Sequence, residues 1–174
     1  MIYKFRILSD EIEEFIRVFE VPDNITFFKF HLALQKELEY DNSQIACFYQ
    51  SNGNWEKVQE FSLFDLTEDN SRHILSMETS VLKDFVSEKK DRLMYVFDIF
   101  SERILFMELV DIIEENGIED NNPVCTYSAG NPPQQIVFDK IGNGEFDTEF
   151  NDEYDEDSDL DSDFNLDEAG FDDE

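Results

Sequence analysis

The sequence predicts an α+β domain built on a largely antiparallel sheet with two helices, followed by a disordered acidic C-terminal tail. Three observations support this fold class. Apolar and polar residues alternate in several short segments, which indicates half-buried strands. Two longer segments carry apolar residues at helical spacing. The chain has 18 phenylalanines, most of them before residue 140, and this apolar area is enough to drive folding of the front portion.

Two strands are expected near the N-terminus. In "IYKFRIL" (residues 2–8), three side chains share one face: Tyr3, Phe5 and Ile7. The segment "FIRVFEV" (residues 15–21) predicts the second strand, which Pro22 stops.

Two helices are expected after these strands. Thr26 is placed to cap "FFKFHLALQKELEY" (residues 27–40), in which four apolar residues recur at helical spacing: Phe27, Phe30, Leu34 and Leu38. The segment "ETSVLKDFVSEKKD" (residues 78–91) predicts a short amphipathic helix that starts near Thr79.

Two antiparallel hairpins complete the expected sheet. "QIACFYQ" (residues 44–50) and "WEKVQEF" (residues 55–61) flank Asn52-Gly53, a pair that supplies the positive φ angles of a tight turn. "RLMYVFDIF" (residues 92–100) and "RILFMELVDII" (residues 103–113) alternate well enough for the second hairpin. Because antiparallel pairs dominate this order, we expect an α+β domain rather than a doubly wound parallel sheet.

Charge divides the chain into an expected domain, residues 1–142, and an expected disordered tail, residues 143–174. The net charge is −30, and the stretch from Glu145 to the end holds 16 acidic residues and no Lys or Arg. Residues 1–144 are acidic as well, with 27 acidic against 13 basic residues. Nucleic-acid affinity depends on Lys and Arg neutralising phosphates, so we expect neither direct nucleic-acid binding nor binding to an anionic membrane.

Cysteine and histidine usage argues against a zinc site. Cys47 and Cys125 match no zinc-ligand spacing, and the chain has two histidines in all. The N-terminal residues lack the apolar run of a signal peptide, and no stretch is long enough for a membrane span. We therefore expect a soluble cytoplasmic protein with reduced thiols and no cofactor.

Three segments resemble motifs of one protein family. They are "FIRVFEVPDNITFFKFH" (residues 15–31), "YVFDIF" (residues 95–100) and "NPVCTYSAGNPPQQ" (residues 122–135). Together they resemble the plasmid pRi ORF-three-like domain family, which includes insertion-sequence passenger proteins. The resemblance covers roughly residues 1–140. It implies an α+β domain on a large antiparallel sheet and attaches no firm activity to it.

The chain departs from the family pattern at several positions. In the hairpin, Phe100 and Ser101 replace a Gly and an Asp, and Arg103 and Leu105 stand where the family has a Trp and a His. Further departures are Glu39-Tyr40 for Gly-Trp, Gln44-Ile45 for His-Leu, and Gln134 for the Glu after two prolines. Any polar site that these positions form in other members is therefore mostly missing here.

Three residues are the candidates for a polar site in the domain: His31, Tyr95 and Asp98. His31 lies on the apolar side of its helix, where it is either a general base helped by Asp98 or a packed histidine with a local hydrogen-bond partner. Asp98 interrupts a strand face otherwise set by Met94, Val96 and Phe100, so it is either functional or bonded to a turn amide. No catalytic constellation emerges, and we expect a protein that is not an enzyme.

The tail holds a partial match to a calcium-binding loop. Asp157, Asp159, Asp161 and Glu168 occupy the ligand positions of an EF-hand, but Ser162 replaces the glycine that the turn requires. In so acidic a segment such a match arises easily by chance. We expect loose attraction of divalent cations rather than a defined metal site.

These observations favour a non-catalytic protein-interaction module whose acidic tail keeps it in solution or steers it to a basic protein partner. One alternative is a mobile-element accessory protein that acts through DNA mimicry or a DNA-binding partner. Another alternative is a weak calcium binder that acts through the tail.

Overall fold

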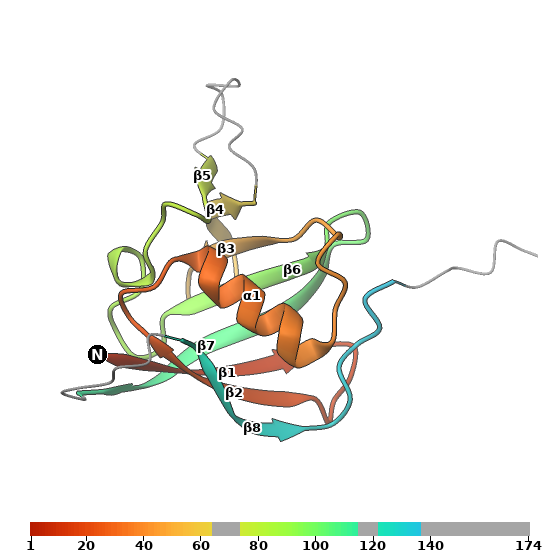
Figure 1. Ribbon diagram of the computed structural model, residues 1–174, viewed down its shortest axis with the longest axis horizontal. Helices are drawn as coiled ribbons and strands as arrows, with labels where there is room; N and C mark the ends of the chain where they lie inside the picture. The colour runs from red at the N-terminus through yellow and green to blue at the C-terminus, as the bar shows by residue number, and fades with distance from the viewer. Residues whose placement is uncertain (64–73, 115–121, 137–174) are drawn as a thin grey trace, which may run out of the picture. The chain divides into compact units, whose positions relative to one another are not determined.

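The computed structural model describes residues 1–63, 74–114 and 122–136 (Figure 1). The chain divides into two units, Met1–Val137 and Phe138–Glu174, and the second lies outside the described residues, as does the expected acidic tail. The elements in chain order are β1 (Ile2–Ser9), β2 (Ile16–Pro22), α1 (Phe27–Leu38), β3 (Cys47–Ser51), β4 (Lys57–Ser62), β5 (Ile74–Ser76), the 3-10 turn η1 (Leu82–Asp84), β6 (Arg92–Asp98), β7 (Arg103–Ile113) and β8 (Val124–Ala129).

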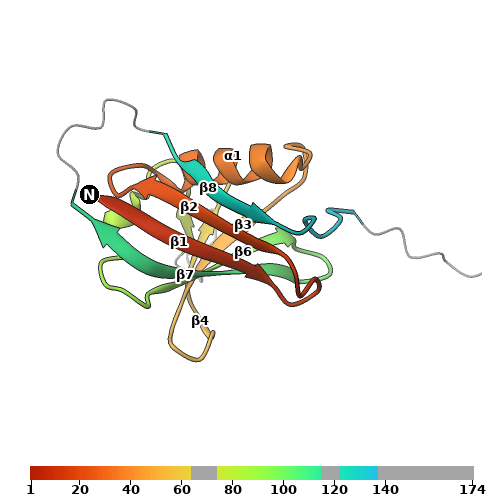
Figure 2. The same ribbon diagram turned by 90° about the horizontal axis from the view of Figure 1, so that it is seen from below.

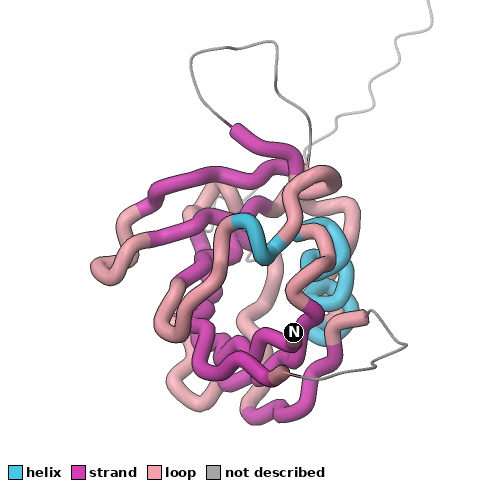
Figure 3. The backbone as a smooth tube through the Cα atoms, turned by 90° about the vertical axis from the view of Figure 1, so that its left-hand side faces the viewer, coloured by secondary structure: helices cyan, strands magenta, loops and turns pink. Residues whose placement is uncertain are grey.

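Eight strands form one mixed sheet in the order β5-β4-β3-β6-β7-β1-β2-β8. Neighbouring strands run antiparallel except β4 and β5, which are parallel. β8 lies beside β2 at the end of the order (Figure 2). The sheet curves, and α1 lies on its inner side (Figure 3). The predicted fold class is therefore wrong: the sheet is a large mixed one, and the described residues hold one α-helix, not two.

Residues 78–91, expected as a second helix, form only the short turn η1. Their backbone donors are used in tertiary hydrogen bonds: the amides of Leu82 and Lys83 donate to the carbonyls of Ile25 and Asp23, at 2.9 and 3.0 Å. In an α-helix the Lys83 amide would instead donate to a carbonyl of its own segment. In residues 78–91, hydrogen bonds to the loop before α1 therefore replace the helix that the spacing of apolar residues predicted.

Helix α1 forms as predicted. The Thr26 hydroxyl oxygen accepts a hydrogen bond from the Lys29 amide at 3.3 Å, which satisfies one of the free donors at the helix start. The helix ends at Glu39, which has a left-handed φ of 56° and donates its amide to the Gln35 and Lys36 carbonyls. Its buried face consists of Phe27, Phe30, His31, Leu34, Gln35 and Leu38.

Both predicted hairpins are confirmed, but the turn of the first differs from the expected one. Among the described residues, the positive φ of this loop is at Trp55, at 63°, and not at Asn52 or Gly53. The Asn52 Oδ1 accepts the amides of Asn54 and Glu56 at 2.9 and 3.0 Å. This side-chain acceptor closes a loop longer than the tight two-residue turn.

The core between α1 and the sheet is built from stacked aromatic rings. Phe27 stacks on Phe61 with 4.0 Å between ring centroids. Phe30 contacts Phe5 of β1 and Phe48 of β3, at 5.5 and 5.8 Å. Each of these rings buries a large apolar area, so they help to fix α1 on the sheet.

The chain after β8 is held by Arg17 of β2. One guanidinium nitrogen donates to the Ala129 and Gly130 carbonyls at 2.7 and 3.0 Å. Gly130 has a φ of +65°, and a Cβ there would lie 2.5 Å from the Glu14 carbonyl oxygen. Glycine is therefore required at this position. Among the described helices, none has the length and apolar character needed to cross a membrane.

Candidate functional site

Two of the three candidate polar residues meet in the interior. His31 projects from α1 and Tyr95 from β6, and the His31 Nδ1 lies 2.9 Å from the Tyr95 hydroxyl oxygen. Both side chains are buried. They meet because the apolar faces of α1 and β6 point into the same layer of the core.

Gln35 completes this cluster, although the sequence patterns did not single it out. Its Nε2 donates to the Tyr95 hydroxyl oxygen, while its Oε1 is buried and has no partner among the described residues. The signal available in the sequence was its position four residues after His31, which places both side chains on one helix face. We call these three residues, His31, Gln35 and Tyr95, the buried polar cluster.

Burial keeps the buried polar cluster uncharged. Desolvation lowers the pKa of His31 from 6.5 to about 4, so the imidazole is neutral at pH 7. Desolvation also raises the pKa of the Tyr95 phenol, against a smaller opposing effect of the hydrogen bond from Gln35. Since the Tyr95 oxygen accepts from Gln35, its hydrogen can point to the His31 Nδ1, which places the imidazole proton on Nε2. This is the arrangement of a packed histidine with a local partner.

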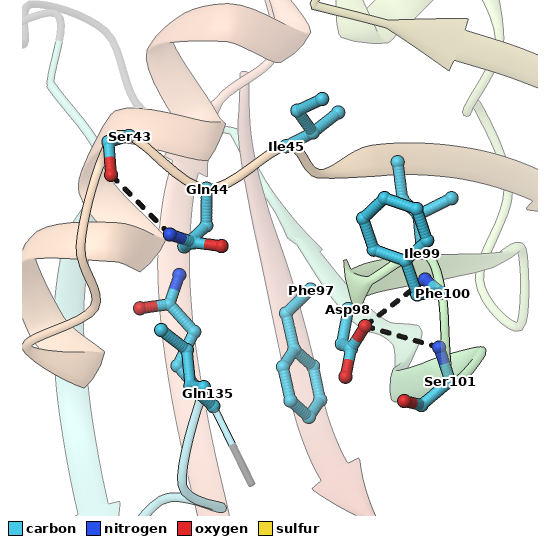
Figure 4. A pocket seen from close by; sticks show the side chains of 10 residues that line it. Ser43, Gln44, Ile45, Phe97, Asp98, Ile99, Phe100, Ser101 and Gln135 are labelled. Carbon is cyan, nitrogen blue, oxygen red and sulfur yellow. Dashed lines mark hydrogen bonds between the residues drawn. The ribbon is translucent and has the colours of Figure 1, made fainter. Parts of the chain in front are cut away.

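Asp98 does not join the buried polar cluster. It ends β6, and its Oδ1 accepts the amides of Phe100 and Ser101 at 3.1 and 3.2 Å (Figure 4). This capping fixes the turn to β7, in which Glu102 adopts a left-handed φ of 51°. Phe100 does not share the strand face with Met94 as expected, because the strand ends before it.

A pocket of about 400 Å³ opens beside this turn. Three segments form it, and Figure 4 shows their side chains. Four apolar side chains on its rim remain in contact with solvent: Ile45 (46% exposed), Ile99 (40%), Phe100 (95%) and Ile136 (45%). The rest of the lining is Ser43, Gln44, Phe97, Asp98, Ser101 and Gln135. We call this feature the turn pocket.

The walls of the turn pocket are joined by hydrogen bonds between distant segments. The Gln135 side chain bonds the Asp41 backbone at both ends: its Oε1 accepts the amide at 2.6 Å, and its Nε2 donates to the carbonyl at 3.1 Å. The buried Tyr40 donates its hydroxyl to the Pro133 carbonyl at 2.7 Å. Residues 133–135 are thus fixed to the residues that follow α1.

Arg103, the first residue of β7, also helps to fix the walls of the turn pocket. We call the contacts made by Tyr40, Arg103 and Gln135 the frame of this pocket. The guanidinium of Arg103 makes a two-pronged ion pair with Glu11, at 2.8 and 2.6 Å, and donates to the Gln135 carbonyl at 3.2 Å. Its plane lies over the Phe97 ring, 4.8 Å from the centroid. The charge of Arg103 is therefore paired with Glu11, and its planar guanidinium suits both this two-pronged pair and the stacking on the Phe97 ring.

The described residues can be compared with the requirements of metal and thiol sites. Within residues 1–63, 74–114 and 122–136, no three His, Cys, Asp or Glu side chains gather as a metal site would require. Cys47 is buried, and burial raises the pKa of its thiol to about 11. The candidate calcium ligands lie outside the described residues: Asp157, Asp159, Asp161 and Glu168.

Comparison with known proteins identifies the family. The family described as plasmid pRiA4b ORF-3-like protein matches residues 1–173, further than the motifs extend. The chain belongs to this family. A solved structure, described as a protein of unknown function (MM3350) from Methanosarcina mazei, is 21% identical with a TM-score of 0.58. The similarity covers 73% of this chain and 68% of that one, and it shows a shared fold. A search among curated proteins finds no match.

Some of the positions at which the sequence departs from the motifs described above lie at the turn pocket, although Glu39, Leu105 and Gln134 do not line it. Gln44 and Ile45, which replace a His and a Leu, line it, as do Phe100 and Ser101. Arg103, in place of the motif's Trp, is part of the frame. These positions thus contribute to the lining of the turn pocket and to the contacts that fix its walls.

Proposed function

We propose that this member of the family is a non-catalytic protein-interaction module that binds a partner at the turn pocket. The observation that carries the proposal is Phe100. Its ring is almost fully exposed, yet its backbone amide is fixed by Asp98. An exposed aromatic side chain on a rigid turn is the kind of residue that dominates the energy of protein interfaces.

The surroundings of Phe100 support the same role. Ile45, Ile99 and Ile136 extend the apolar surface around it, and the frame of Tyr40 and Arg103 keeps their segments in place. A surface fixed before binding loses little conformational entropy on association, so more of the contact energy appears as affinity.

The acidic segment from Glu145 onward adds a second element to the proposal. Its 16 acidic residues attract a cationic partner over long range, which raises the association rate at low salt. Replacing these acids with Asn and Gln in the full chain should lower the association rate and flatten its salt dependence. The dissociation rate should change little, because short-range contacts at the pocket determine it.

The experiment is affinity capture with the full-length protein, a Phe100→Ser variant and a Val58→Ser control. Val58 is 65% exposed and lies outside the pocket lining, so its variant removes a comparable exposed apolar side chain elsewhere. A protein retained by the parent is identified by mass spectrometry, purified and titrated against all three. We expect Phe100→Ser to weaken binding by about tenfold or more and Val58→Ser to leave it unchanged.

Equal affinity of the parent and Phe100→Ser for every captured protein contradicts the proposal. Sedimentation of the purified chain tests whether the partner is a second copy of this chain. A dimer that dissociates in the Phe100→Ser variant would show that the turn pocket mediates self-association and not binding to a different protein.

A further inference from the structure

We infer that the turn pocket selects a peptide segment in which an apolar anchor residue is adjacent to a lysine or arginine, and that Asp98 is the residue that selects the cation. This inference rests on the proposed function and names the chemistry of its partner. It makes Asp98 a specificity-determining residue in addition to its part in the turn.

Asp98 has the geometry for this role. Its Oδ1 is occupied by the amides of Phe100 and Ser101, but its Oδ2 accepts no hydrogen bond from the described residues. The carboxylate lies in the pocket lining next to apolar side chains (Figure 4). Asp98 is half-buried, and partial exclusion of water strengthens the attraction between a carboxylate and a cation.

No cation of the described residues competes for this oxygen. The pocket lining contains no Lys or Arg. The guanidinium of Arg103 is close enough to feel the charge of Asp98, but it is held by Glu11, the Gln135 carbonyl and the Phe97 ring. An anionic partner would meet Asp98 with no free positive charge beside it. A cationic group next to the apolar anchor would supply the missing charge.

Asp98→Asn is a clean test of the charge. The Asn Oδ1 can accept the same two amides, so the turn is kept while the negative charge is removed. A phage-displayed random dodecapeptide library is selected on the immobilised full-length parent, on Asp98→Asn and on Phe100→Ser. The best synthetic peptides are then titrated against all three proteins at low and high salt.

We expect parent-selected peptides to carry an aromatic or aliphatic residue next to a Lys or Arg. Asp98→Asn should bind them about fivefold more weakly at low salt, with a smaller difference at high salt. Replacing the adjacent Lys or Arg in the peptide with Gln should remove the difference between the two proteins. Amide exchange of Phe100 and Ser101, compared between the two, reports whether the turn is intact.

The outcomes separate this inference from the proposed function. Peptides that depend on Phe100 but show no basic preference, or that bind Asp98→Asn as tightly as the parent, overturn the inference and leave the proposed function standing. Failure of the parent to enrich any sequence over Phe100→Ser overturns both.

Discussion

The imidazole of His31 and the hydroxyl of Tyr95 form a 2.9 Å hydrogen bond between α1 and β6. Gln35 donates to the same hydroxyl, so one phenol oxygen links two positions of the helix to the sheet. Buried polar groups of this kind stabilise a fold only while each partner is in place and uncharged. The buried polar cluster is therefore a sensitive point for both pH and mutation.

Acid should destabilise the protein through His31. The unfolded chain takes up a proton near pH 6.5, but the folded protein does so only near pH 4, so the free energy of unfolding falls as the pH drops through this window. The contribution from this residue is at most about 3 kcal/mol. Chemical denaturation of the parent and His31→Gln at about pH 7 and about pH 4 isolates it from the many carboxylates that titrate in both proteins.

The stability advantage of the parent over His31→Gln should shrink at the lower pH. An advantage that is the same at both pH values would show that His31 does not titrate in this way.

Loss of the Tyr95 hydroxyl should also destabilise the fold. Tyr95→Phe leaves the His31 Nδ1 and the Gln35 amide buried without their partner, at a cost of about 1–3 kcal/mol. Tyr127→Phe is the matched control, since Tyr127 is 54% exposed. Urea denaturation measures both. A change in Tyr95→Phe no larger than in Tyr127→Phe would contradict this role of the cluster.

Two glycines should differ sharply in their tolerance of alanine. Gly130→Ala combines a left-handed backbone with a Cβ placed against the Glu14 carbonyl, so we expect a loss of at least about 1–2 kcal/mol. Gly53 has open space where a Cβ would project and no positive φ, so Gly53→Ala should be within about 0.5 kcal/mol of the parent. Equal melting temperatures for the two variants would contradict this assignment.

Local sequence patterns predicted the elements that local forces determine. The alternation in β1, the cap at Thr26 and the apolar face of α1 all appear where expected. The helix expected at residues 78–91 does not form, because the amides of Leu82 and Lys83 donate hydrogen bonds to the loop before α1. Strands β5 and β8 were missed because they are short or exposed, and neighbours decide their pairing.

The candidate site likewise has a part that the sequence could predict and a part that it could not. His31 and Tyr95 could be brought together from the faces of their elements, and Gln35 was within reach of the same argument. The turn pocket was not predictable, because its walls come from three segments far apart in the chain. The alternation of residues 92–100 placed Phe100 on a strand face with Met94 and Val96, whereas the strand ends at Asp98 and leaves Phe100 in the turn.

The most direct test of the central claim is an isoleucine-methyl NMR titration of the full-length protein with the captured partner. Binding at the turn pocket predicts shifts confined to its rim, at Ile45, Ile99 and Ile136, and their loss in Phe100→Ser. Unperturbed rim methyls at saturating partner, or equal shifts in Phe100→Ser, would contradict it.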